Sequence, residues 1–368
     1  MNEIRVGMVG AGYIAGAHSA AYRAAAGTFL DGRRRLQLTR VADVDESRAQ
    51  AVAREWGWEA STGDWKAITR SDDVDLISVA VPNVFHAEIA CDALAHGKHV
   101  ICEKPMSDGL IGATQMHAAA TSSGRLAQVC FYYRLWPAIA WAGALVAGGR
   151  IGEVTHLRCW MLQDYAANPS TVLGWRAEGA PAGAGALGDL GSHVIDIARF
   201  FCGEIAEVTC RTRNDLRGLE SQVDDLATAL LNFRSGATGV LEASWALRGH
   251  QCDLGFDLAG TDGAIRFSWE RANEIEVLFG NTDNPENGFR RILVGRSQPF
   301  AEPFAGVPGQ GLGYRDAFTI GVGQMLLAIT DGQPTVTPSF EDGLRAAEVV
   351  EACLRSVGSQ ASELVSQP

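Results

Sequence analysis

The sequence predicts an α/β fold, with a doubly wound parallel sheet in its N-terminal part and an antiparallel sheet in its C-terminal part. Strand-like and helix-like segments alternate at short intervals up to about residue 130, as expected where crossover helices connect parallel strands. Beyond that point strand-like segments follow one another directly, which is typical of an antiparallel α+β domain. A chain of 368 residues has room for two domains, and we divide it into residues 1–130 and 131–368.

The strands expected in the first domain are short runs of apolar and β-branched residues. They cover residues 4–9, 36–41, 75–81, 99–102 and 126–131. The first helix is expected to extend from a glycine-rich turn to about residue 24, and further helices at residues 47–56, 86–96 and 108–123. The continuous apolar run at 75–81 is typical of a central strand that is buried on both faces.

The second domain is expected to contain seven strands separated by turn residues such as Arg234-Ser235-Gly236 and Thr261-Asp262-Gly263. These strands cover residues 154–163, 207–213, 227–233, 238–245, 253–259, 264–267 and 274–278. Two helices follow at residues 315–330 and 340–357, and residues 359–368 are expected to form a polar tail.

The composition excludes several classes of protein. A net charge of −12, from 31 basic and 43 acidic residues, argues against binding to the phosphate backbone of nucleic acids. The eight cysteines form no CxxC pair, so we expect a reduced, cytoplasmic protein without a metal site. No run of about 18 apolar residues occurs, and residues 1–10 resemble a strand more than a targeting segment, so we expect no contact with a membrane.

The segment Gly10-Ala11-Gly12-Tyr13-Ile14-Ala15 connects the first expected strand to the first expected helix. Gly10 permits a tight turn, Gly12 allows close approach to a pyrophosphate, and Ala15 lets the helix pack on the strand. The N-terminus of the helix then favours the phosphate charge. We therefore predict a dinucleotide site that includes Gly10, Gly12, Tyr13 and Ile14. The alternative is a glycine turn without a ligand.

An acidic residue after the second strand is expected to contact the adenosine ribose. Asp43 has this position, and its carboxylate would repel a 2′-phosphate, which favours NAD over NADP. Asp43 lies 31 residues after Gly12, where about 20 is usual, because residues 27–35 form an insert. Arg48 lies nearby and weakens the argument for NAD. The alternative role for Asp43 is to cap the following helix.

Glu103-Lys104-Pro105 follows an expected parallel strand, at the end of the strand where such sheets bind ligands. The side chain of Lys104 could hydrogen-bond a substrate hydroxyl and favour its deprotonation. The alternative is that Lys104 is an ordinary solvated surface charge.

Asp189 and His193 are four residues apart at the start of a segment with helical spacing, so both are expected on one side of the first turn. Imidazole can accept the proton of an alcohol near neutral pH, and a neighbouring carboxylate can orient it. The alternative is that Asp189 caps the helix and that His193 is a satisfied surface group.

Glu103-Lys104-Pro105 after a glycine-loop domain, with Asp189 and His193 about 85 residues further on, resembles the Gfo/Idh/MocA oxidoreductase family over nearly the whole chain. The resemblance implies that Lys104, Asp189 and His193 carry catalysis. It also implies a large open C-terminal sheet that builds dimers or tetramers. Further matching segments are Val81-Pro82-Asn83 with His86, Gly97-Lys98-His99-Val100, Tyr133-Arg134 and Val223-Asp224-Asp225.

The resemblance extends to binding residues. It implies cofactor contacts from Val81, Pro82, Asn83, His86, Glu103, Lys104, Arg134, Trp175 and Arg176. It implies substrate contacts from Lys104, Tyr133, Gln163, Arg176, Asp189 and His193.

More narrowly, four segments are similar to the branch that contains levoglucosan, inositol and L-glucose dehydrogenases. Tyr132 departs from the asparagine found before Tyr-Arg in some relatives. The branch implies an NAD-dependent enzyme that oxidises a hydroxyl of a cyclic polyol or sugar. The four segments are Leu162-Gln163-Asp164-Tyr165, Gly174-Trp175-Arg176, Gly185-Ala186-Leu187-Gly188-Asp189 and Gly311-Leu312-Gly313-Tyr314.

Three other functions remain open. A zinc-dependent alcohol dehydrogenase would need sets of cysteine and histidine ligands, and the cysteines are too scattered to supply them. A non-catalytic NAD-binding regulator would not need Lys104, Asp189 and His193 together. A lyase or hydrolase that uses NAD transiently would release product without net NADH.

Overall fold

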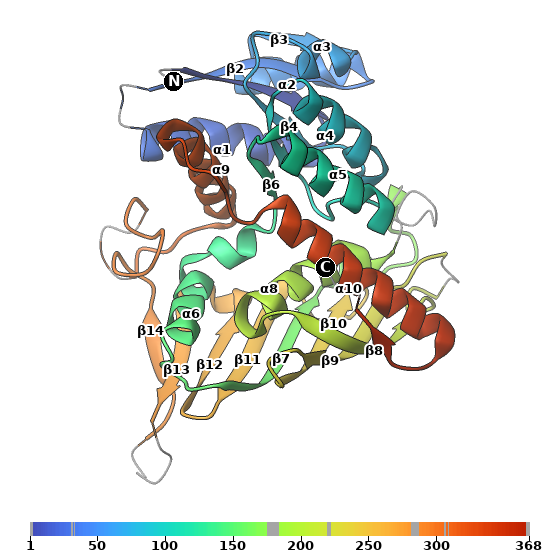
Figure 1. Cartoon of the computed structure of the whole chain (residues 1–368), viewed down its shortest axis with the longest axis vertical. Coiled ribbons are helices and arrows are strands. Elements are labelled where there is room, and N and C mark those ends of the chain that lie inside the picture. The colour runs from blue at the N-terminus through green and yellow to red at the C-terminus, as the bar shows by residue number, and fades with distance from the viewer. Residues whose placement is uncertain are drawn as a thin grey trace. The chain divides into compact units, whose positions relative to one another are not determined.

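The computed structural model describes residues 3–30, 32, 34–174, 184–218, 222–280, 287–304, 307 and 309–365. The chain forms two compact units: Met1–Tyr132 with Gly313–Ala347, and Tyr133–Leu312 with Glu348–Pro368 (Figure 1). The division expected at 130/131 did not include the return of the chain to the first unit at Gly313. This return occurs because helix α9 (Tyr314–Asp331) packs along α1 (Tyr13–Phe29).

The first unit contains a six-stranded sheet in which every pairing is parallel, in the order β3-β2-β1-β4-β5-β6. The doubly wound parallel sheet is therefore confirmed. The sequence analysis did not include the short edge strand β3. The strands are β1 (Glu3–Val9), β2 (Arg35–Ala42), β3 (Ala60–Thr62), β4 (Leu76–Val79), β5 (His99–Cys102) and β6 (Ala127–Val129).

The carboxyl ends of five of these strands lie level with one another. Val9 at the end of β1 pairs with Ala42 of β2 and with Val79 of β4. Cys102 of β5 pairs with Val79 and with Val129 of β6. The residues that follow these strands therefore share one edge of the sheet, which is the edge where open parallel sheets bind ligands.

The helices of the first unit are close to those expected, although α1 continues to Phe29 rather than ending near residue 24. A glycine explains how α9 approaches the end of α1, since a Cβ added to Gly323 would lie 2.3 Å from the ring of Phe29. The remaining helices are α2 (Glu46–Trp56), α3 (Lys66–Thr69), α4 (His86–Ala95) and α5 (Leu110–Ser123).

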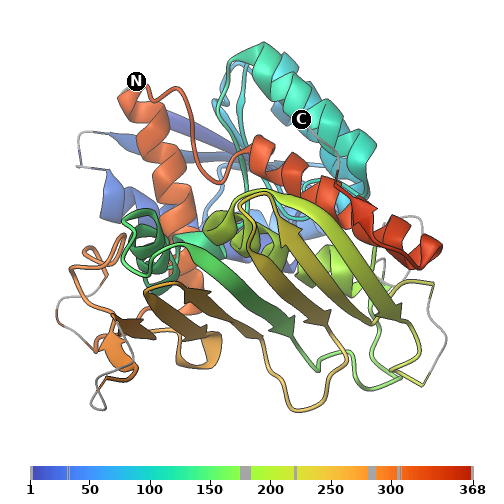
Figure 2. The same ribbon diagram turned by 60° about the horizontal axis from the view of Figure 1, so that its bottom comes forward.

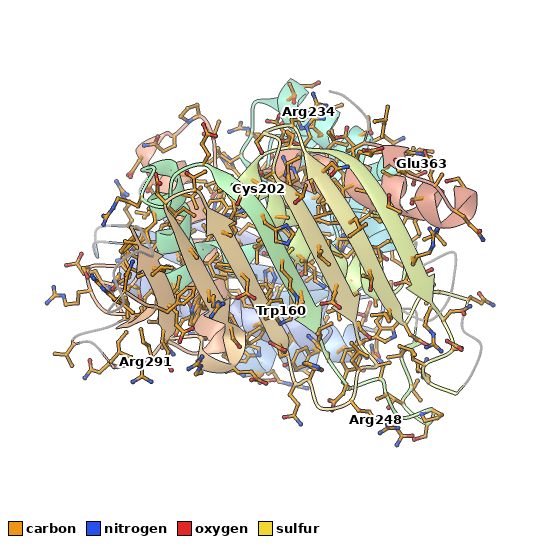
Figure 3. All side chains as sticks on the ribbon, turned by 90° about the horizontal axis from the view of Figure 1, so that it is seen from below. Trp160, Cys202, Arg234, Arg248, Arg291 and Glu363 are labelled. Atoms are coloured by element: carbon orange, nitrogen blue, oxygen red, sulfur yellow. The ribbon has the colours of Figure 1, made fainter. Side chains whose placement is uncertain are left out.

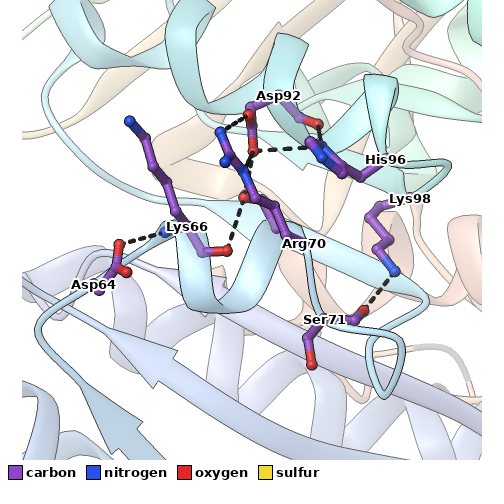
Figure 4. Close-up of polar contacts among 8 residues, drawn as sticks. Asp64, Lys66, Arg70, Ser71, Asp92, His96 and Lys98 are labelled. Carbon is purple, nitrogen blue, oxygen red and sulfur yellow. Dashed lines mark hydrogen bonds and ion pairs between the residues drawn. The ribbon is translucent and has the colours of Figure 1, made fainter.

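A polar network joins α3 to α4 at the surface of the first unit (Figure 4). The Asp92 carboxylate accepts hydrogen bonds from the Thr69 hydroxyl at 2.6 Å and from the Arg70 guanidinium at 2.8 Å. Burial acts to raise the pKa of Asp92, but these bonds outweigh it and hold the pKa below its usual range. Lys98 Nζ donates to the carbonyl of Ser71 at 2.6 Å, which fixes the turn before β4.

The second unit contains a nine-stranded sheet in the order β14-β13-β12-β11-β7-β10-β9-β8-β15 (Figure 2). The mostly antiparallel sheet is confirmed, and only β7 and β10 pair in parallel. The strands are β7 (Val154–Leu162), β8 (Ile205–Arg213), β9 (Leu226–Phe233), β10 (Thr238–Ser244), β11 (Asp253–Gly260), β12 (Gly263–Ser268), β13 (Glu274–Phe279), β14 (Arg290–Leu293) and β15 (Glu363–Leu364).

A polar tail was expected at residues 359–368, and this expectation is corrected: Glu363–Leu364 form β15, which pairs with β8. Two side chains of helix α10 (Phe340–Ser359) fix the turn between α10 and β15. The Ser356 hydroxyl donates to the carbonyl of Ala361 at 2.5 Å, and the Arg355 guanidinium donates to the carbonyl of Leu364 at 2.7 Å. Long-range pairing therefore orders a segment that has no strand pattern of its own.

Helices α6 (Pro137–Ala147) and α8 (Ser192–Cys202) lie against one face of this sheet. The opposite face is open in the described chain, and Figure 3 views it directly. On this face the Arg158 guanidinium lies 5.3 Å from the ring of Trp160, and Trp160 Nε1 donates to Asp253 at 3.0 Å. Among the described residues, no helix combines the length and the apolar character needed to cross a bilayer.

Candidate active site

The glycine loop between β1 and α1 has the geometry that dinucleotide binding requires. Gly10 has φ +106°, and a Cβ there would lie 2.2 Å from the carbonyl oxygen of Ala80, so only glycine fits. Gly12 is the N-cap of α1, where no side chain caps the helix, and a Cβ there would meet no described atom within 4 Å. The N-terminus of α1 thus has no side-chain cap and leaves space at Gly12, which suits a pyrophosphate.

Asp43 follows β2 and is tied to this loop. One oxygen accepts a hydrogen bond from the amide of Ala11 at 2.8 Å, and the other accepts from the amide of Asp45 at 2.9 Å. The residue that caps α2 is Asp45, which accepts from the amides of Ser47 and Arg48. The alternative role of Asp43 as the helix cap is therefore wrong. Arg48, which had weakened the argument for NAD, pairs with Asp45 at 3.2 Å.

Large apolar side chains are exposed along the same edge of the first unit. Tyr13 follows β1 and is 91% exposed, Val44 follows β2 and is 92% exposed, and Phe85 follows β4 and is 50% exposed. Apolar groups so exposed at the carboxyl ends of parallel strands suit the flat rings of a dinucleotide. Together with the open helix N-terminus and Asp43, they fit NAD.

Replacing Asp43 with Ser is expected to weaken NAD binding. A hydrogen bond to a charged group contributes about 1.5–3 kcal/mol, so we expect roughly a 10- to 100-fold higher Kd for NAD. Loss of the carboxylate should also narrow the preference for NAD over NADP, because its repulsion of a 2′-phosphate disappears. Calorimetric titration with both nucleotides measures these effects. Asp45→Asn, which keeps a good helix cap, is the matched control and should leave the Kd within about twofold of wild type.

The ends of β4 and β5 are joined by His86. Its Nε2 lies 2.8 Å from the carbonyl oxygen of Val81, and its Nδ1 lies 3.0 Å from that of Pro105. Burial lowers the pKa of His86, although both carbonyls act in the opposite direction. This imidazole holds the Val81-Pro82-Asn83 segment beside Lys104-Pro105.

The carboxylate of Glu103 is turned into the first unit. It lies 2.9 Å from Nε2 of His18 on α1, and it accepts a hydrogen bond from the amide of Lys104 at 3.1 Å. Glu103 was predicted to contact the cofactor. In the structure its oxygens contact His18 and the main chain of its own loop.

The second unit carries the other catalytic candidates on consecutive turns. Asp189 lies in a π-helical turn, Leu187–Gly191, that leads into α8, and His193 lies in the first turn of α8. His193 is only 7% exposed, and its ring packs edge-on against Tyr133 with centroids 4.8 Å apart. The alternative that His193 is a surface group is therefore wrong. The cap position of α8 is Gly191 and not Asp189.

Asp224 anchors the turn that carries Asp189. Its two carboxylate oxygens accept hydrogen bonds from the amides of Gly185 at 2.8 Å and Leu187 at 2.7 Å, and its carbonyl accepts from Ala186 at 2.9 Å. Burial raises the pKa of Asp224 against the effect of these amides. Val223-Asp224-Asp225 was noted in the sequence, but no role was assigned to it, because the contact joins residues 37–39 positions apart.

Replacing Asp224 with Asn leaves one oxygen to serve two amides. We expect kcat to fall roughly tenfold, because a buried charged acceptor is lost and the turn shifts. Asp225→Asn is the matched control. Asp225 is also buried and accepts from Trp245 Nε1 at 2.8 Å through one oxygen, while its other oxygen has no partner among the described residues. Steady-state kinetics should show kcat within about twofold of wild type for this control; equal losses in both variants would contradict the anchoring role.

The remaining predicted residues have varied surroundings. Tyr133 lies between His193 and Trp269, with its ring centroid 4.8 Å from each. The Arg134 guanidinium forms a two-pronged pair with Asp196 of α8, inside the second unit. Gln163 follows β7, and its main-chain N–H donates to the carbonyl oxygen of Ser244 at 2.7 Å. Trp175 and Arg176 lie outside the described residues.

The first unit has the features of a Rossmann-type nucleotide-binding domain: a parallel sheet, a glycine loop at its carboxyl edge and an acidic residue after the second strand. The chain belongs to the Gfo/Idh/MocA oxidoreductase family. Residues 4–131 match the family model described as "oxidoreductase family, NAD-binding Rossmann fold". Residues 139–266 match the GFO/IDH/MocA C-terminal domain. The family resemblance and the NAD cofactor are thus confirmed.

Relatives of known activity resemble the whole chain. Levoglucosan dehydrogenase of Pseudarthrobacter phenanthrenivorans is 33% identical, over 98% of this chain and 97% of its own. A solved structure of levoglucosan dehydrogenase, in complex with NADH and levoglucosan, has a TM-score of 0.96 and 34% identity, covering 99% of this chain and 100% of its own. Inositol 2-dehydrogenase of Rubrobacter xylanophilus is 27% identical, over 99% of this chain and 93% of its own.

Proposed function

We propose that the protein is an NAD-dependent dehydrogenase that oxidises a hydroxyl of a cyclic polyol or sugar, such as levoglucosan, an inositol or L-glucose, to the ketone or lactone. The observation that carries this proposal is the similarity to levoglucosan dehydrogenase, which extends over both units. The edge of the first unit that carries the glycine loop and Asp43 supports the proposal independently, because it fits NAD.

Each candidate residue has a role in this proposal. The amides at the N-terminus of α1 bind the pyrophosphate, and Asp43 binds the ribose hydroxyls. His193 accepts the proton of the substrate hydroxyl, while Lys104 hydrogen-bonds the same oxygen. Asp189 fixes a neighbouring group and orients His193. Bound NAD supplies the hydride-accepting chemistry, and the chain orients the substrate and moves the proton.

We also propose that the protein acts in the cytoplasm as a homodimer or homotetramer. The described cysteines are free thiols, as suits a reducing compartment. The open face of the nine-stranded sheet has apolar side chains such as Leu230, which is 60% exposed, and it suits a second copy. Light scattering coupled to size exclusion should give a mass of two or four chains; a monomer would contradict this part of the proposal.

The function is tested by following NADH absorbance with the purified protein and a panel of levoglucosan, myo- and scyllo-inositol and L-glucose. NAD and NADP are supplied in parallel. We expect NADH formation with at least one of these rings and a lower rate with NADP. Tight NAD binding without NADH on any ring would instead favour a regulator, and product without net NADH would favour a lyase or hydrolase. Loss of activity on chelation would favour a metal enzyme.

A further inference from the structure

A chain of buried polar groups lies beneath the loop that carries Lys104, and the proposed chemistry does not use it. His18 of α1 is 0% exposed. Its Nδ1 lies 3.2 Å from the hydroxyl of Ser78 on β4, and its Nε2 lies 2.9 Å from the Glu103 carboxylate. The Ser78 hydroxyl lies 2.7 Å from the phenol oxygen of Tyr22, one turn further along α1.

The direction of the bond between His18 and Glu103 follows from its acceptor. An ionised carboxylate offers only acceptor atoms, so Nε2 of His18 donates to Glu103. On the other side of the imidazole, the Ser78 hydroxyl contacts both Nδ1 and the phenol oxygen of Tyr22. Burial raises the pKa of Tyr22 far above its usual value, so its hydroxyl stays protonated in this contact.

The Glu103 carboxylate connects this cluster to the main chain of Lys104. Its second oxygen accepts the amide proton of Lys104 at 3.1 Å. Burial acts to raise the pKa of Glu103, but the hydrogen bond from His18 and the electrostatic effects of His18 and Lys104 outweigh it and keep the pKa below its usual range. An ionised carboxylate can accept from His18 and from Lys104 at the same time.

Two other functions for this cluster do not fit. Ser78, His18 and Glu103 follow the order of a serine hydrolase triad, but Ser78 and His18 are both 0% exposed, so no substrate reaches them. His18, Glu103 and Cys130 offer ligand atoms within 4.8 Å of one another. Two ligands of one tetrahedral zinc ion would lie about 3.4 Å apart, whereas His18 and Glu103 are at hydrogen-bond distance. Burial also raises the pKa of the Cys130 thiol well above its usual value.

We propose that His18 is a positioning residue for Lys104, and that it acts by fixing the Glu103 carboxylate, which in turn fixes the main chain of the lysine. This proposal rests on the proposed dehydrogenase function, in which Lys104 bonds the substrate hydroxyl. His18 does not touch the substrate, so its loss affects turnover only through the placement of Lys104.

Two substitutions separate this role from general support of the fold. His18→Gln keeps an N–H donor near the place of Nε2 and therefore keeps the bond to Glu103. His18→Asn keeps a polar group near the place of Nδ1 and loses that bond. We expect His18→Asn to lower kcat roughly tenfold with an unchanged Kd for NAD, and His18→Gln to stay within about threefold of wild type. A third variant, Tyr22→Phe, removes only the first bond of the chain and should have a smaller effect than His18→Asn.

Hydrogen exchange at the Lys104 amide provides a readout that does not depend on turnover. We expect faster exchange at this amide in His18→Asn than in wild type or His18→Gln. If no ring is oxidised by the wild type, the proposed function fails, but this exchange comparison still decides the role of His18. Equal kcat losses in both variants, unchanged exchange at Lys104, or stoichiometric zinc that is lost on substitution of His18 would each overturn the proposal.

Discussion

Replacing His193 with Ala is expected to lower kcat by about 10²- to 10⁴-fold, which is the usual contribution of a positioned general base. The variant removes the imidazole that accepts the hydroxyl proton in the proposed reaction. The Kd for NAD should not change, because His193 is not among the residues expected to contact the cofactor. Stopped-flow or steady-state NADH formation measures kcat, and calorimetry measures the Kd.

His96→Ala is the control for this experiment. His96 is exposed at the C-terminal cap of α4, and its Nδ1 lies 2.7 Å from the carbonyl oxygen of Asp92. Its removal should leave kcat within about twofold of wild type, as is usual for surface substitutions. A folded His193→Ala protein with kcat close to wild type would remove His193 from the mechanism.

Replacing Lys104 with Ala is expected to lower kcat by about 10²- to 10³-fold, a loss comparable to that of one donor to a developing oxyanion. The lysine would donate a hydrogen bond to the substrate oxygen, and its charge would favour deprotonation of the hydroxyl. Lys104→Arg keeps the charge but changes the shape of the donor, so it should recover only part of the rate. Steady-state kinetics at saturating NAD measures both variants.

The chain contains only three lysines, so few other ammonium groups could take the place of Lys104. Lys66 is exposed at the start of α3, with its Nζ 5.1 Å from the ring of Trp65, and it serves as the control. Lys66→Ala should retain wild-type kcat. A Lys104→Ala protein that binds NAD and keeps near-full turnover would show that Lys104 is an ordinary solvated surface charge.

Local patterns predicted the sheets, but not the pairings between distant segments. β1, the glycine loop and α1 were recognisable because one short segment contains the apolar run, the glycines and the helix start. β15 was missed because Glu363–Leu364 is a strand only through its pairing with β8. Helix α6 was missed because Pro137–Ala147 is apolar on nearly every side and lacks the alternation that marks a surface helix.

The same limit applies to the candidate site. The sequence placed Asp43 and Asp45 two residues apart, and only the hydrogen bonds distinguish the residue that binds the glycine loop from the residue that caps α2. Asp224 and His18 act across long stretches of sequence, and no spacing rule connects Asp224 to Gly185 or His18 to Glu103.

The transfer of deuterium from a carbon-deuterated substrate to NAD tests the central claim most directly. The substrate is the ring found active in the panel, with deuterium at every carbon-bound position, and the nucleotide is analysed by mass spectrometry. We expect one NADH, heavier by one mass unit, for each molecule of ketone or lactone formed. NADH without the extra mass unit, or product that forms without net NADH, would contradict direct hydride transfer from the substrate carbon, and the second result would favour transient use of NAD.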